Sequence, residues 1–402
     1  MDTSRPTGGV MPQDFLLSKE QLLARQDSKW RRYASDVIPA YVADMDFRVA
    51  PAVQNAILKS VDIADYGYPM RDGKALDRVM AEAFAARMEG RFGWKTDPDL
   101  VQGLADLVQA TFACVTAFSE PGDGVVVQVP NYPPFRAAVE QTGRKLVPLP
   151  MVDDGERYVF DLEALEKTMP TNTRVFILCS PQNPMGRCFD KAELEAILAF
   201  AERRDLIVVA DEIHSDIVFD GRRHIPFASL GSAAAARTAT LTSATKSFNI
   251  PGLRTALISF GTPELKARFH ERIPGRLLGS VNALGVDATV AAWTSADDWL
   301  DAVVAHLQSM RDRAAAALAR EIPGIRVRKP EATYLTWLDC TDLGIEGTAF
   351  DFFHDKAKVA FSAGETFLPG AEKFVRMNLA TSAELLDEMI GRMADAVRAN
   401  AR

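Results

Sequence analysis

Several polar side chains follow directly after short apolar runs, and their types could together perform acid–base and nucleophilic chemistry. They are Asn183 after VFILC, Asp211 and His214 after LIVVA, and Ser243, Thr245, Lys246 and Arg254 after TATLT. Taken singly, each would be an ordinary cap, turn residue or solvated charge. Because ligands of open α/β sheets bind where parallel strands end, the shared position of these residues indicates one site.

A lysine, a carboxylate, an amide, small hydroxyls and an arginine are the set that chemistry on pyridoxal phosphate requires. A lysine must form the Schiff base with the cofactor and later move protons as the free amine. A carboxylate must pair with the pyridine nitrogen, so that the ring can accept electrons. The phosphate needs backbone N–H groups at a helix start, hydroxyls and an arginine. An aromatic side chain should lie on the ring, and a second arginine should take the substrate carboxylate in a two-pronged bond.

The elements that must position these residues alternate along the middle of the chain. Six apolar runs predict strands: Gly124–Pro130, Lys145–Pro150, Val175–Cys179, Leu206–Ala210, Thr238–Thr242 and Ala256–Phe260. Helical patterns separate them, for example at Lys191–Arg204, and a helix over Ala105–Ala117 is expected after Gly103. Strands that are apolar on both faces and alternate with helices predict an α/β fold with a mostly parallel sheet.

After Phe260 the pattern changes and predicts a second, smaller α+β domain. Long helices are expected at Ala302–Arg320 and Ser382–Asn400, with a short β-rich part between them at Ile325–Val327, Thr333–Leu338 and Phe374–Leu379. A chain of 402 residues is long enough for two such units. We expect residues 1–45 to pack on the small domain, residues 46–285 to form the large cofactor-binding domain, and residues 286–402 to form the small one.

Composition excludes several classes of protein. The formal net charge of -8 argues against a nucleic-acid partner. No apolar run approaches the roughly 20 residues needed to cross a bilayer. Residues 1–12 lack the apolar core of a secretory signal and predict a disordered leader. The four cysteines have no zinc-binding spacing, so we expect no metal site, a reducing compartment and a cytoplasmic protein.

The pattern S-x-T-K-x-F-N-x-x-G-x-R at Ser243–Arg254 resembles that of the fold-type I pyridoxal-phosphate enzymes of the class I/II aminotransferase family. The resemblance covers the chain from about Asp27 to Arg398. It implies an aspartate aminotransferase-like fold whose large domain has a mostly parallel seven-stranded sheet. It also implies a homodimer with shared active sites, acting on a small amino-acid substrate.

The resemblance further implies a role for each site residue. At the cofactor ring, Lys246 would be the Schiff-base lysine, Asp211 the pyridinium partner, Tyr132 the stacked aromatic and Asn183 the contact to the 3-oxygen. The phosphate would be bound by Ser243, Thr245, Arg254 and the backbone N–H groups of Leu104 and Ala105, and Tyr68 would reach the phosphate of the neighbouring subunit. The substrate carboxylate would be bound by Arg376 with Asn183 and the backbone near Ala43. His214 falls where many aminotransferases have a tyrosine, and both a cofactor contact and a packed histidine remain open.

Five local signatures are most similar to the MalY/PatB branch of carbon–sulfur β-lyases, which includes cystathionine β-lyases. They are YVADMDFRVAP, YGYP, VPNYPPF, SPQNPMGR and ADEIHSDIVF. Such enzymes cleave an S-substituted cysteine to thiol, pyruvate and ammonia. Two stretches depart from the branch, GLADLV at the phosphate turn and NLATSAELL after Arg376. The first places Asp106 near the dianionic phosphate, which is unfavourable unless its carboxylate points away or caps the helix. An ordinary first-turn carboxylate is the favoured interpretation.

The residues leave other functions open. An aminotransferase would share the carbanion intermediate with the lyase, and the geometry of the pocket decides between the two outcomes. Decarboxylation-dependent oxidative deamination is a related possibility, against which Arg376 weighs. A cofactor-binding regulator that acts through a protein partner belongs to another class. The substrate side chain, whether of cystathionine or of a specialised S-conjugate, and the pathway are not specified by the sequence.

Overall fold

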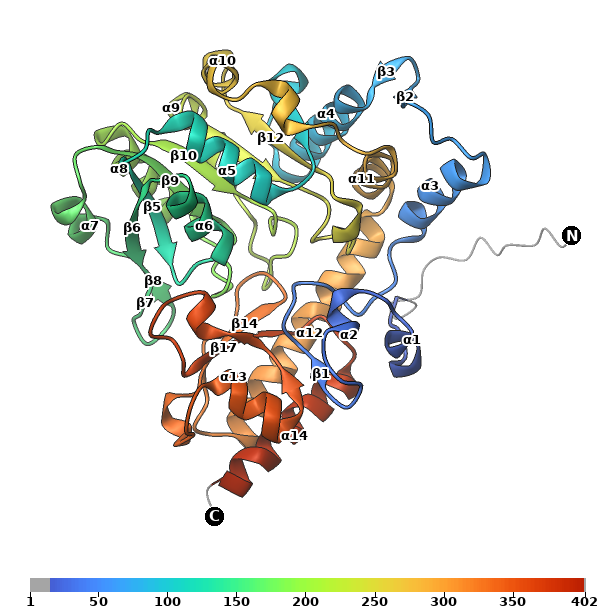
Figure 1. The fold of residues 1–402 in the computed structure, drawn as a ribbon, viewed down its shortest axis with the longest axis vertical. Helices are drawn as coiled ribbons and strands as arrows, with labels where there is room; N and C mark the ends of the chain where they lie inside the picture. Colours follow the sequence, from blue (N-terminus) through green and yellow to red (C-terminus); the bar gives the residue numbers. More distant parts are fainter. Residues whose placement is uncertain (1–14, 401–402) are drawn as a thin grey trace, which may run out of the picture.

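The computed structural model describes residues 15–400, and the leader predicted at residues 1–12 lies outside them. Its centre is a seven-stranded sheet (Figure 1). The strand order is β4 (Val101–Leu104), β12 (Ala256–Phe260), β11 (Thr238–Thr242), β10 (Ile207–Asp211), β9 (Thr173–Cys179), β5 (Gly124–Val129) and β6 (Lys145–Pro150). Only β12 runs antiparallel to its neighbours. The predicted mostly parallel α/β sheet is confirmed.

All six predicted strands form. A seventh strand, β4, lies at the edge of the sheet beside β12. Its four residues, VQGL, are too short and too mixed in polarity to show a strand pattern. A Cβ atom on Gly103 would lie 2.7 Å from Asp77 Oδ1 of α4 (Leu76–Arg87), so the glycine allows that helix to pack directly against β4. This contact fixes the end of β4 from which the phosphate turn continues.

Helices cover both faces of the sheet, which explains why its strands are apolar on both sides. Val125 and Val127 of β5 pack with α5 (Leu107–Phe118), α6 (Pro133–Gln141) and α10 (Pro263–Arg272). Val126, which points the other way, packs with α7 (Leu162–Thr168), α8 (Lys191–Arg203) and α9 (Ser232–Ala235). The alternation of side chains along a strand therefore divides the core into two layers.

The C-terminal part is built on a four-stranded antiparallel sheet, where the sequence pattern predicts a short β-rich part of three segments. Its order is β13 (Arg326–Val327), β14 (Leu335–Asp339), β17 (Phe374–Asn378) and β16 (Ser362–Ala363). The short α13 (Ala349–Phe352) and the long α12 (Asp297–Glu321) and α14 (Ala383–Asn400) pack on it. Figure 1 shows α12 running between the large sheet and this lower part.

The helix α12 begins five residues before the predicted start at Ala302, because the apolar stripe extends upstream. Trp299, Leu300 and Val303 pack in the core of the large part, whereas Met310 and Ala314 pack in the core of the small part. One helix therefore belongs to both cores. The division of the chain at residues 45/46 and 285/286 stays a prediction.

The N-terminal segment contributes α1 (Lys19–Leu23), α2 (Ser28–Arg31) and β1 (Ile38–Pro39). The strand β1 pairs in parallel with β15 (Val359–Ala360), and Leu22 and Trp30 join the core of the small part. The remaining elements are α3 (Pro51–Asp62), α11 (Ala283–Ser295), and the small hairpins β2 (Met70–Arg71) with β3 (Lys74–Ala75) and β7 (Val152–Asp153) with β8 (Tyr158–Val159).

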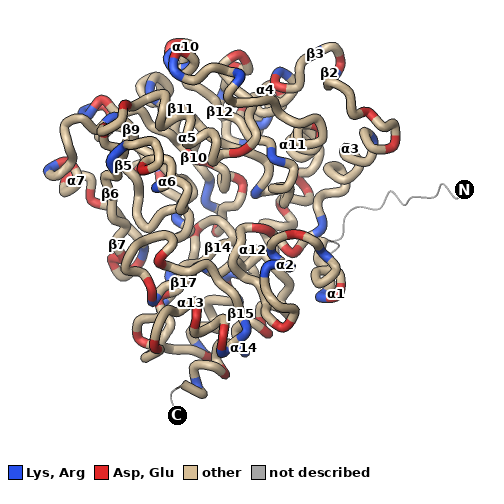
Figure 2. Tube along the Cα trace, viewed as in Figure 1, with Lys and Arg blue, Asp and Glu red and all other residues tan. Residues whose placement is uncertain are grey.

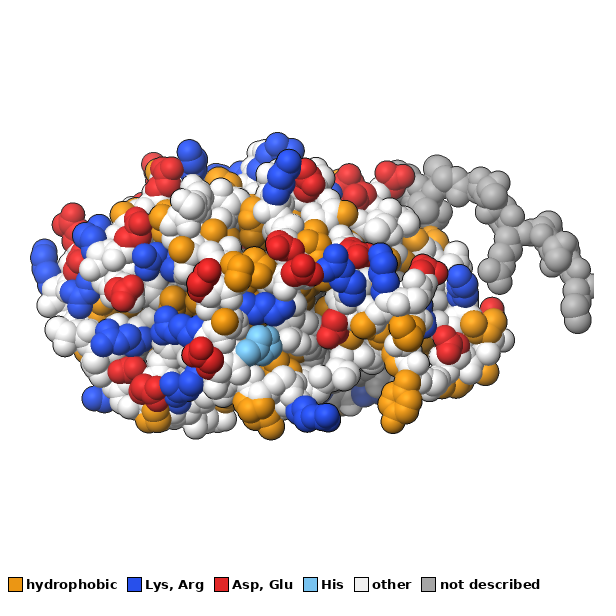
Figure 3. Space-filling model, turned by 90° about the horizontal axis from the view of Figure 1, so that it is seen from above, with side chains coloured by type: hydrophobic (Ala, Val, Ile, Leu, Met, Phe, Trp, Pro, Cys, Tyr) orange, Lys and Arg blue, Asp and Glu red, His pale blue; other side chains and the backbone are white. Residues whose placement is uncertain are grey.

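Charges of both signs are spread along the chain rather than gathered on one element (Figure 2). On the face that Figure 3 shows, acidic, basic and hydrophobic side chains are interspersed. None of the helices within residues 15–400 is both long and apolar enough to cross a membrane.

Candidate active site

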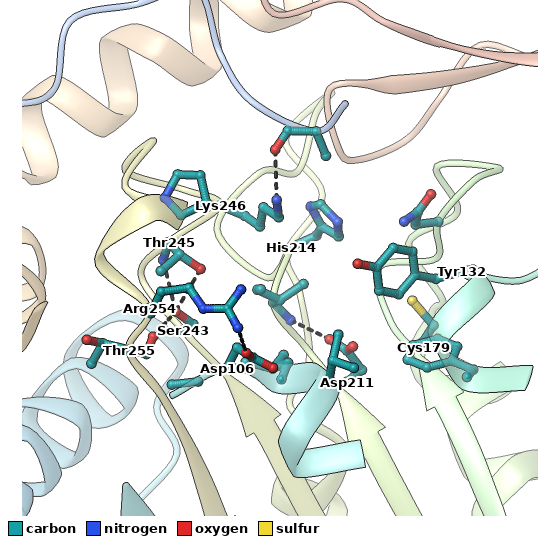
Figure 4. Close-up of a pocket in the computed structure, with 18 of the residues that line it drawn as sticks. Asp106, Tyr132, Cys179, Asp211, His214, Ser243, Thr245, Lys246, Arg254 and Thr255 are labelled. Atoms are coloured by element: carbon teal, nitrogen blue, oxygen red, sulfur yellow. Dashed lines mark hydrogen bonds and ion pairs between the residues drawn. The ribbon is translucent and has the colours of Figure 1, made fainter. Parts of the chain in front are cut away.

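A cavity of about 230 Å³ lies where β9, β10 and β11 end, and it gathers all but two of the predicted site residues (Figure 4). Those that line it are Ala43, Ala105, Tyr132, Asn183, Asp211, His214, Ser243, Thr245, Lys246, Arg254 and Arg376. Leu104 does not line it, because it is the buried last residue of β4. Tyr68 is fully exposed and lies outside it. Both assignments stay predictions.

Lys246 follows β11 and lies half-buried in the cavity wall. Its Nζ donates a hydrogen bond to the carbonyl oxygen of Ala43 at 2.8 Å (Figure 4). The hydroxyl of Tyr334 donates to the same oxygen at 2.9 Å. Burial lowers the pKa of Lys246, while the nearby Asp44 carboxylate opposes the shift. A lysine with a lowered pKa loses its proton more readily, which is what a nucleophilic and basic amine requires.

The segment that carries Lys246 is tied to the irregular stretch at residues 41–47. Asn249, in the left-handed conformation with φ 57°, donates to the carbonyl oxygens of Met45 and Phe47, each at 3.0 Å. It also accepts from Met45 N at 2.9 Å. The carbonyl oxygen of Ala43 is thereby held in front of Lys246. The motif at Ser243–Arg254 includes Asn249 but gave it no role, and the sequence analysis did not name Tyr334, because only tertiary contacts give the two residues this role.

Asp211 is the last residue of β10, and its carboxyl group is buried on the floor of the cavity. Burial raises the pKa of Asp211 to about 7, although Ile213 N donates to its Oδ1 at 3.1 Å and favours the charged form. No cation forms an ion pair with Asp211 within the described residues. A buried carboxyl poised near neutrality is suited to hold a cationic ring nitrogen.

This raised pKa predicts how Asp211→Asn changes stability in the cofactor-free protein. The folded carboxyl keeps its proton to about pH 7, whereas the unfolded one releases it near its ordinary value of 3.8. Between these values the folded state binds more protons, so the free energy of unfolding of the wild type falls as pH rises. The asparagine variant escapes this loss and should gain about 2–3 kcal/mol relative to wild type between about pH 5 and 8.

Urea unfolding of the wild type and of Asp211→Asn, each at about pH 5 and about pH 8, measures this difference in the free energy of unfolding. Asp161→Asn is the matched control, because Asp161 is an exposed cap of α7 with Ala164 N bonded at 2.9 Å. The same pH-dependent gain in both variants, or no gain in Asp211→Asn, would contradict the assignment of a buried neutral carboxyl.

Arg376 on β17 reaches the opposite side of the cavity. Its guanidinium donates to Asn183 Oδ1 at 3.0 Å, to Tyr41 O at 2.8 Å and to Ser362 Oγ at 3.0 Å. It lies 4.8 Å from the centre of the Phe367 ring. Burial lowers the pKa of Arg376 to about 10. Within the described residues it has no carboxylate partner, and its Nε is buried without a hydrogen bond.

A buried guanidinium without an anion inside the protein is well placed to receive one from a ligand. Ser362 and Phe367 hold and cover this guanidinium; the sequence indicated that the segment Phe361–Phe367 contributes to substrate selectivity but gave neither residue a role of its own. Both lie in the FSAGETF stretch before β17, where the only local signal is a turn.

His214 and Tyr132 also line the cavity. Burial and the nearby cations of Lys246 and Arg376 lower the pKa of His214 to about 3, so its imidazole is neutral. Its Nδ1 is buried and has no hydrogen-bond partner within the described residues. The structure therefore does not support a histidine satisfied by packing, and a ligand contact is the better interpretation.

Ser243, Thr245 and Arg254 converge at the start of α5. Ser243 Oγ lies 2.6 Å from Thr255 O, and Thr245 N donates to Ser243 Oγ at 3.0 Å. The helix α5 begins at Leu107, two residues later than predicted, because Asp106 caps it by accepting from Gln109 N at 2.8 Å. Asp106 is therefore the N-cap of α5 rather than an ordinary first-turn carboxylate. Its second oxygen forms an ion pair with Arg254.

No group of three or more His, Cys, Asp or Glu side chains that could hold a metal ion occurs within residues 15–400. The cavity instead offers an amine, two carboxyl groups, two guanidinium groups, hydroxyls and a helix N-terminus. This is the donor set that the sequence predicts for a phosphorylated pyridine aldehyde and an amino acid.

Comparison with known proteins shows the family to which the chain belongs. The sequence model of the aminotransferase class I and II family matches residues 53–393. Cystathionine beta-lyase PatB of Bacillus subtilis (strain 168) is 34% identical over 386 residues, which cover 94% of this chain and 98% of that protein. The crystal structure of OvoB matches with a TM-score of 0.87 and 38% identity over 93% of this chain and 96% of its own.

The crystal structure of cystalysin from Treponema denticola, which contains pyridoxal 5'-phosphate, matches with a TM-score of 0.88 and 28% identity over 96% of this chain and 99% of its own. The predicted aspartate aminotransferase-like fold and the resemblance to the cystathionine β-lyase branch are confirmed. With a cavity that gathers the family's motif residues and with matches over nearly its whole length, this chain belongs to the aminotransferase class I and II family.

Proposed function

We propose that this chain is a pyridoxal-phosphate-dependent carbon–sulfur β-lyase that cleaves an S-substituted cysteine to thiol, pyruvate and ammonia. The observation that carries the proposal is the convergence of Lys246, Asp211 and Arg376 on one cavity. It occurs in a chain that is one third identical to a cystathionine β-lyase over nearly its full length.

The residues of the cavity fit the cofactor. Among residues 15–400, Asp211 has a buried carboxyl without a cationic partner, and His214 Nδ1 is buried without a hydrogen-bond partner, so both can bind a polar group of a ligand. Tyr132 would lie on the ring and Asn183 at its 3-oxygen. Ser243, Thr245, Arg254 and the first backbone N–H groups of α5 would hold the phosphate. When bound, the cofactor supplies an electron sink for the bonds at the substrate Cα.

The chain itself supplies binding, orientation and proton transfer. Arg376 holds the substrate carboxylate, and Asn183, bonded to the same guanidinium at 3.0 Å, fixes its plane. Lys246 Nζ takes the proton from Cα. The Cβ–S bond then breaks with its electron pair on sulfur, and the ammonium of Lys246 can return that proton to the leaving thiolate. Water hydrolyses the remaining three-carbon fragment to pyruvate and ammonia.

Turnover of an S-alkyl cysteine, followed for pyruvate and free thiol, tests the proposal. The lyase releases equal amounts of thiol and pyruvate without added 2-oxo acid. An absolute requirement for a 2-oxo acid would replace the lyase by an aminotransferase. Oxygen- or decarboxylation-dependent products would indicate the related oxidative reaction. Cofactor binding without turnover of any amino acid would favour a regulator.

A homodimer with shared sites is part of the same proposal. Most of the large exposed apolar side chains of the described residues lie in the segment 61–70, and one more is Leu277. Those of the segment are Val61, Ile63, Tyr66, Tyr68 and Met70. Exposed apolar side chains of this size are unfavourable in water and suit contact with a second copy of the chain, whose phosphate Tyr68 would reach. Light scattering should give twice the mass of 44.1 kDa, and a monomer at working concentration would contradict the shared site.

Two further predictions complete the proposal. A cytoplasmic location is supported by the four cysteines, which are all free and buried, as a reducing compartment allows.

The division into an N-terminal segment (1–45), a large domain (46–285) and a small domain (286–402) is supported by the separate hydrophobic cores of the two sheets. Limited proteolysis that cuts within a core rather than near these boundaries would contradict the division.

A further inference from the structure

Asp106 lies at the end of the cavity that the proposed function assigns to the phosphate. One carboxylate oxygen accepts from Gln109 N at 2.8 Å and caps α5. The other forms an ion pair with Arg254, and Figure 4 shows the two side chains pointing toward each other. The anion of Asp106 therefore occupies the same helix N-terminus and the same guanidinium that a phosphate would use.

The side chain of Arg254 is exposed, but it extends from a backbone position that the chain fixes. Its backbone is in the left-handed conformation with φ 49°. Asn282 donates to the carbonyl oxygens of Leu253 and Arg254 and fixes this turn, the latter bond being 3.3 Å long. The guanidinium therefore extends from a fixed point toward the start of α5, where the carboxylate of Asp106 already lies.

Other donors of the phosphate end are also engaged by acceptors of the chain itself. Ala105 N donates to Gln109 Oε1 at 3.2 Å, and Ser243 Oγ lies 2.6 Å from Thr255 O. Asp106 differs from these acceptors because it carries a full charge. A carboxylate and a phosphate dianion that share one guanidinium repel each other, and this repulsion persists at partly exposed sites.

We propose that Asp106 is an internal anion that competes with the cofactor phosphate for Arg254 and thereby weakens the hold on the cofactor. The inference rests on the proposed function, because it takes pyridoxal phosphate as the ligand. Its consequence is an enzyme whose cofactor occupancy follows the concentration of free cofactor. Asp106 keeps the guanidinium of Arg254 in place. The phosphate must either displace the carboxylate of Asp106 or share the guanidinium with it.

Asp106→Asn tests the proposal, because asparagine caps a helix as well as aspartate and removes only the charge. The dissociation constant of pyridoxal phosphate, measured by equilibrium dialysis, should fall about tenfold, as expected for removing one like charge from a partly exposed phosphate site. The dissociation constant of pyridoxal, which lacks the phosphate, should not change. The difference between variant and wild type should shrink as salt is raised, because salt screens the repulsion.

Asp161→Asn is the matched control, since it removes one charge from the exposed cap of α7 and should leave the affinity unchanged. Asp106→Ser, which also caps a helix, should reproduce the tightening if the asparagine variant folds poorly. Unchanged or weaker phosphate-dependent binding in both variants would overturn the proposal and make Asp106 a support for Arg254. A wild type that does not bind pyridoxal phosphate would overturn the proposed function instead, before any variant is compared.

Discussion

Lys246→Ala is expected to lower turnover of an S-substituted cysteine by on the order of 10⁴-fold or more, the upper range for one positioned acid–base group. The reason is that this side chain is both the amine that would join the cofactor and the base that takes the Cα proton. Its Nζ lies in the cavity, 2.8 Å from Ala43 O, and burial has already lowered its pKa. No other lysine lines the cavity.

The measurement has two parts, steady-state turnover and borohydride reduction of the cofactor-loaded protein followed by digestion and peptide mapping. In the wild type the label should be on the peptide that contains Lys246, and in the variant it should be absent. Lys266→Ala is the matched control, because burial also lowers the pKa of Lys266, which bonds to Asp99 O and Val101 O on the edge of the large sheet. A label on another lysine would refute the proposed site.

The gathering of residues in one cavity could be predicted where the end of a strand alone decides their position. Asn183, Asp211 and Lys246 each follow a different strand, and β9, β10 and β11 are adjacent and parallel. The carboxyl ends of adjacent parallel strands must lie together, so an apolar run followed by a polar residue was enough to bring these residues into one cavity. The same reasoning gives the α/β sheet, since each run is apolar on both faces.

The arrangement of residues 41–47 could not be predicted in the same way. This stretch has no regular structure, and its carbonyl groups are held by side chains hundreds of positions away: Asn249, Tyr334, Arg376 and Asn378. No local periodicity encodes such bonds, because each partner is chosen by tertiary packing. The ion pair between Asp106 and Arg254 has the same origin, and the motif alone showed only that a carboxylate stood near the phosphate turn.

Arg376→Lys is expected to lower kcat/KM for an S-alkyl cysteine by roughly 100-fold or more, mostly through KM. Loss of one partner of a buried hydrogen-bonded charge pair costs about 2–5 kcal/mol, and each 1.4 kcal/mol is tenfold. Lysine keeps the charge but cannot present the planar fork that grips a carboxylate with two bonds. It also cannot bond at once to Asn183, Tyr41 O and Ser362, which hold the guanidinium flat against Phe367.

Comparison of two substrates separates carboxylate binding from a general loss of structure. An S-alkyl cysteamine lacks the carboxylate, so wild type and Arg376→Lys should process it equally slowly if Arg376 acts through that group. Arg144→Lys is the matched control, because Arg144 is also buried, bonds to Ser119 and to backbone carbonyls, and lies outside the cavity. If the KM for the amino acid is unchanged, or if activity on the S-alkyl cysteamine falls equally, then Arg376 does not bind the substrate carboxylate. Another residue of the cavity would then have to bind it.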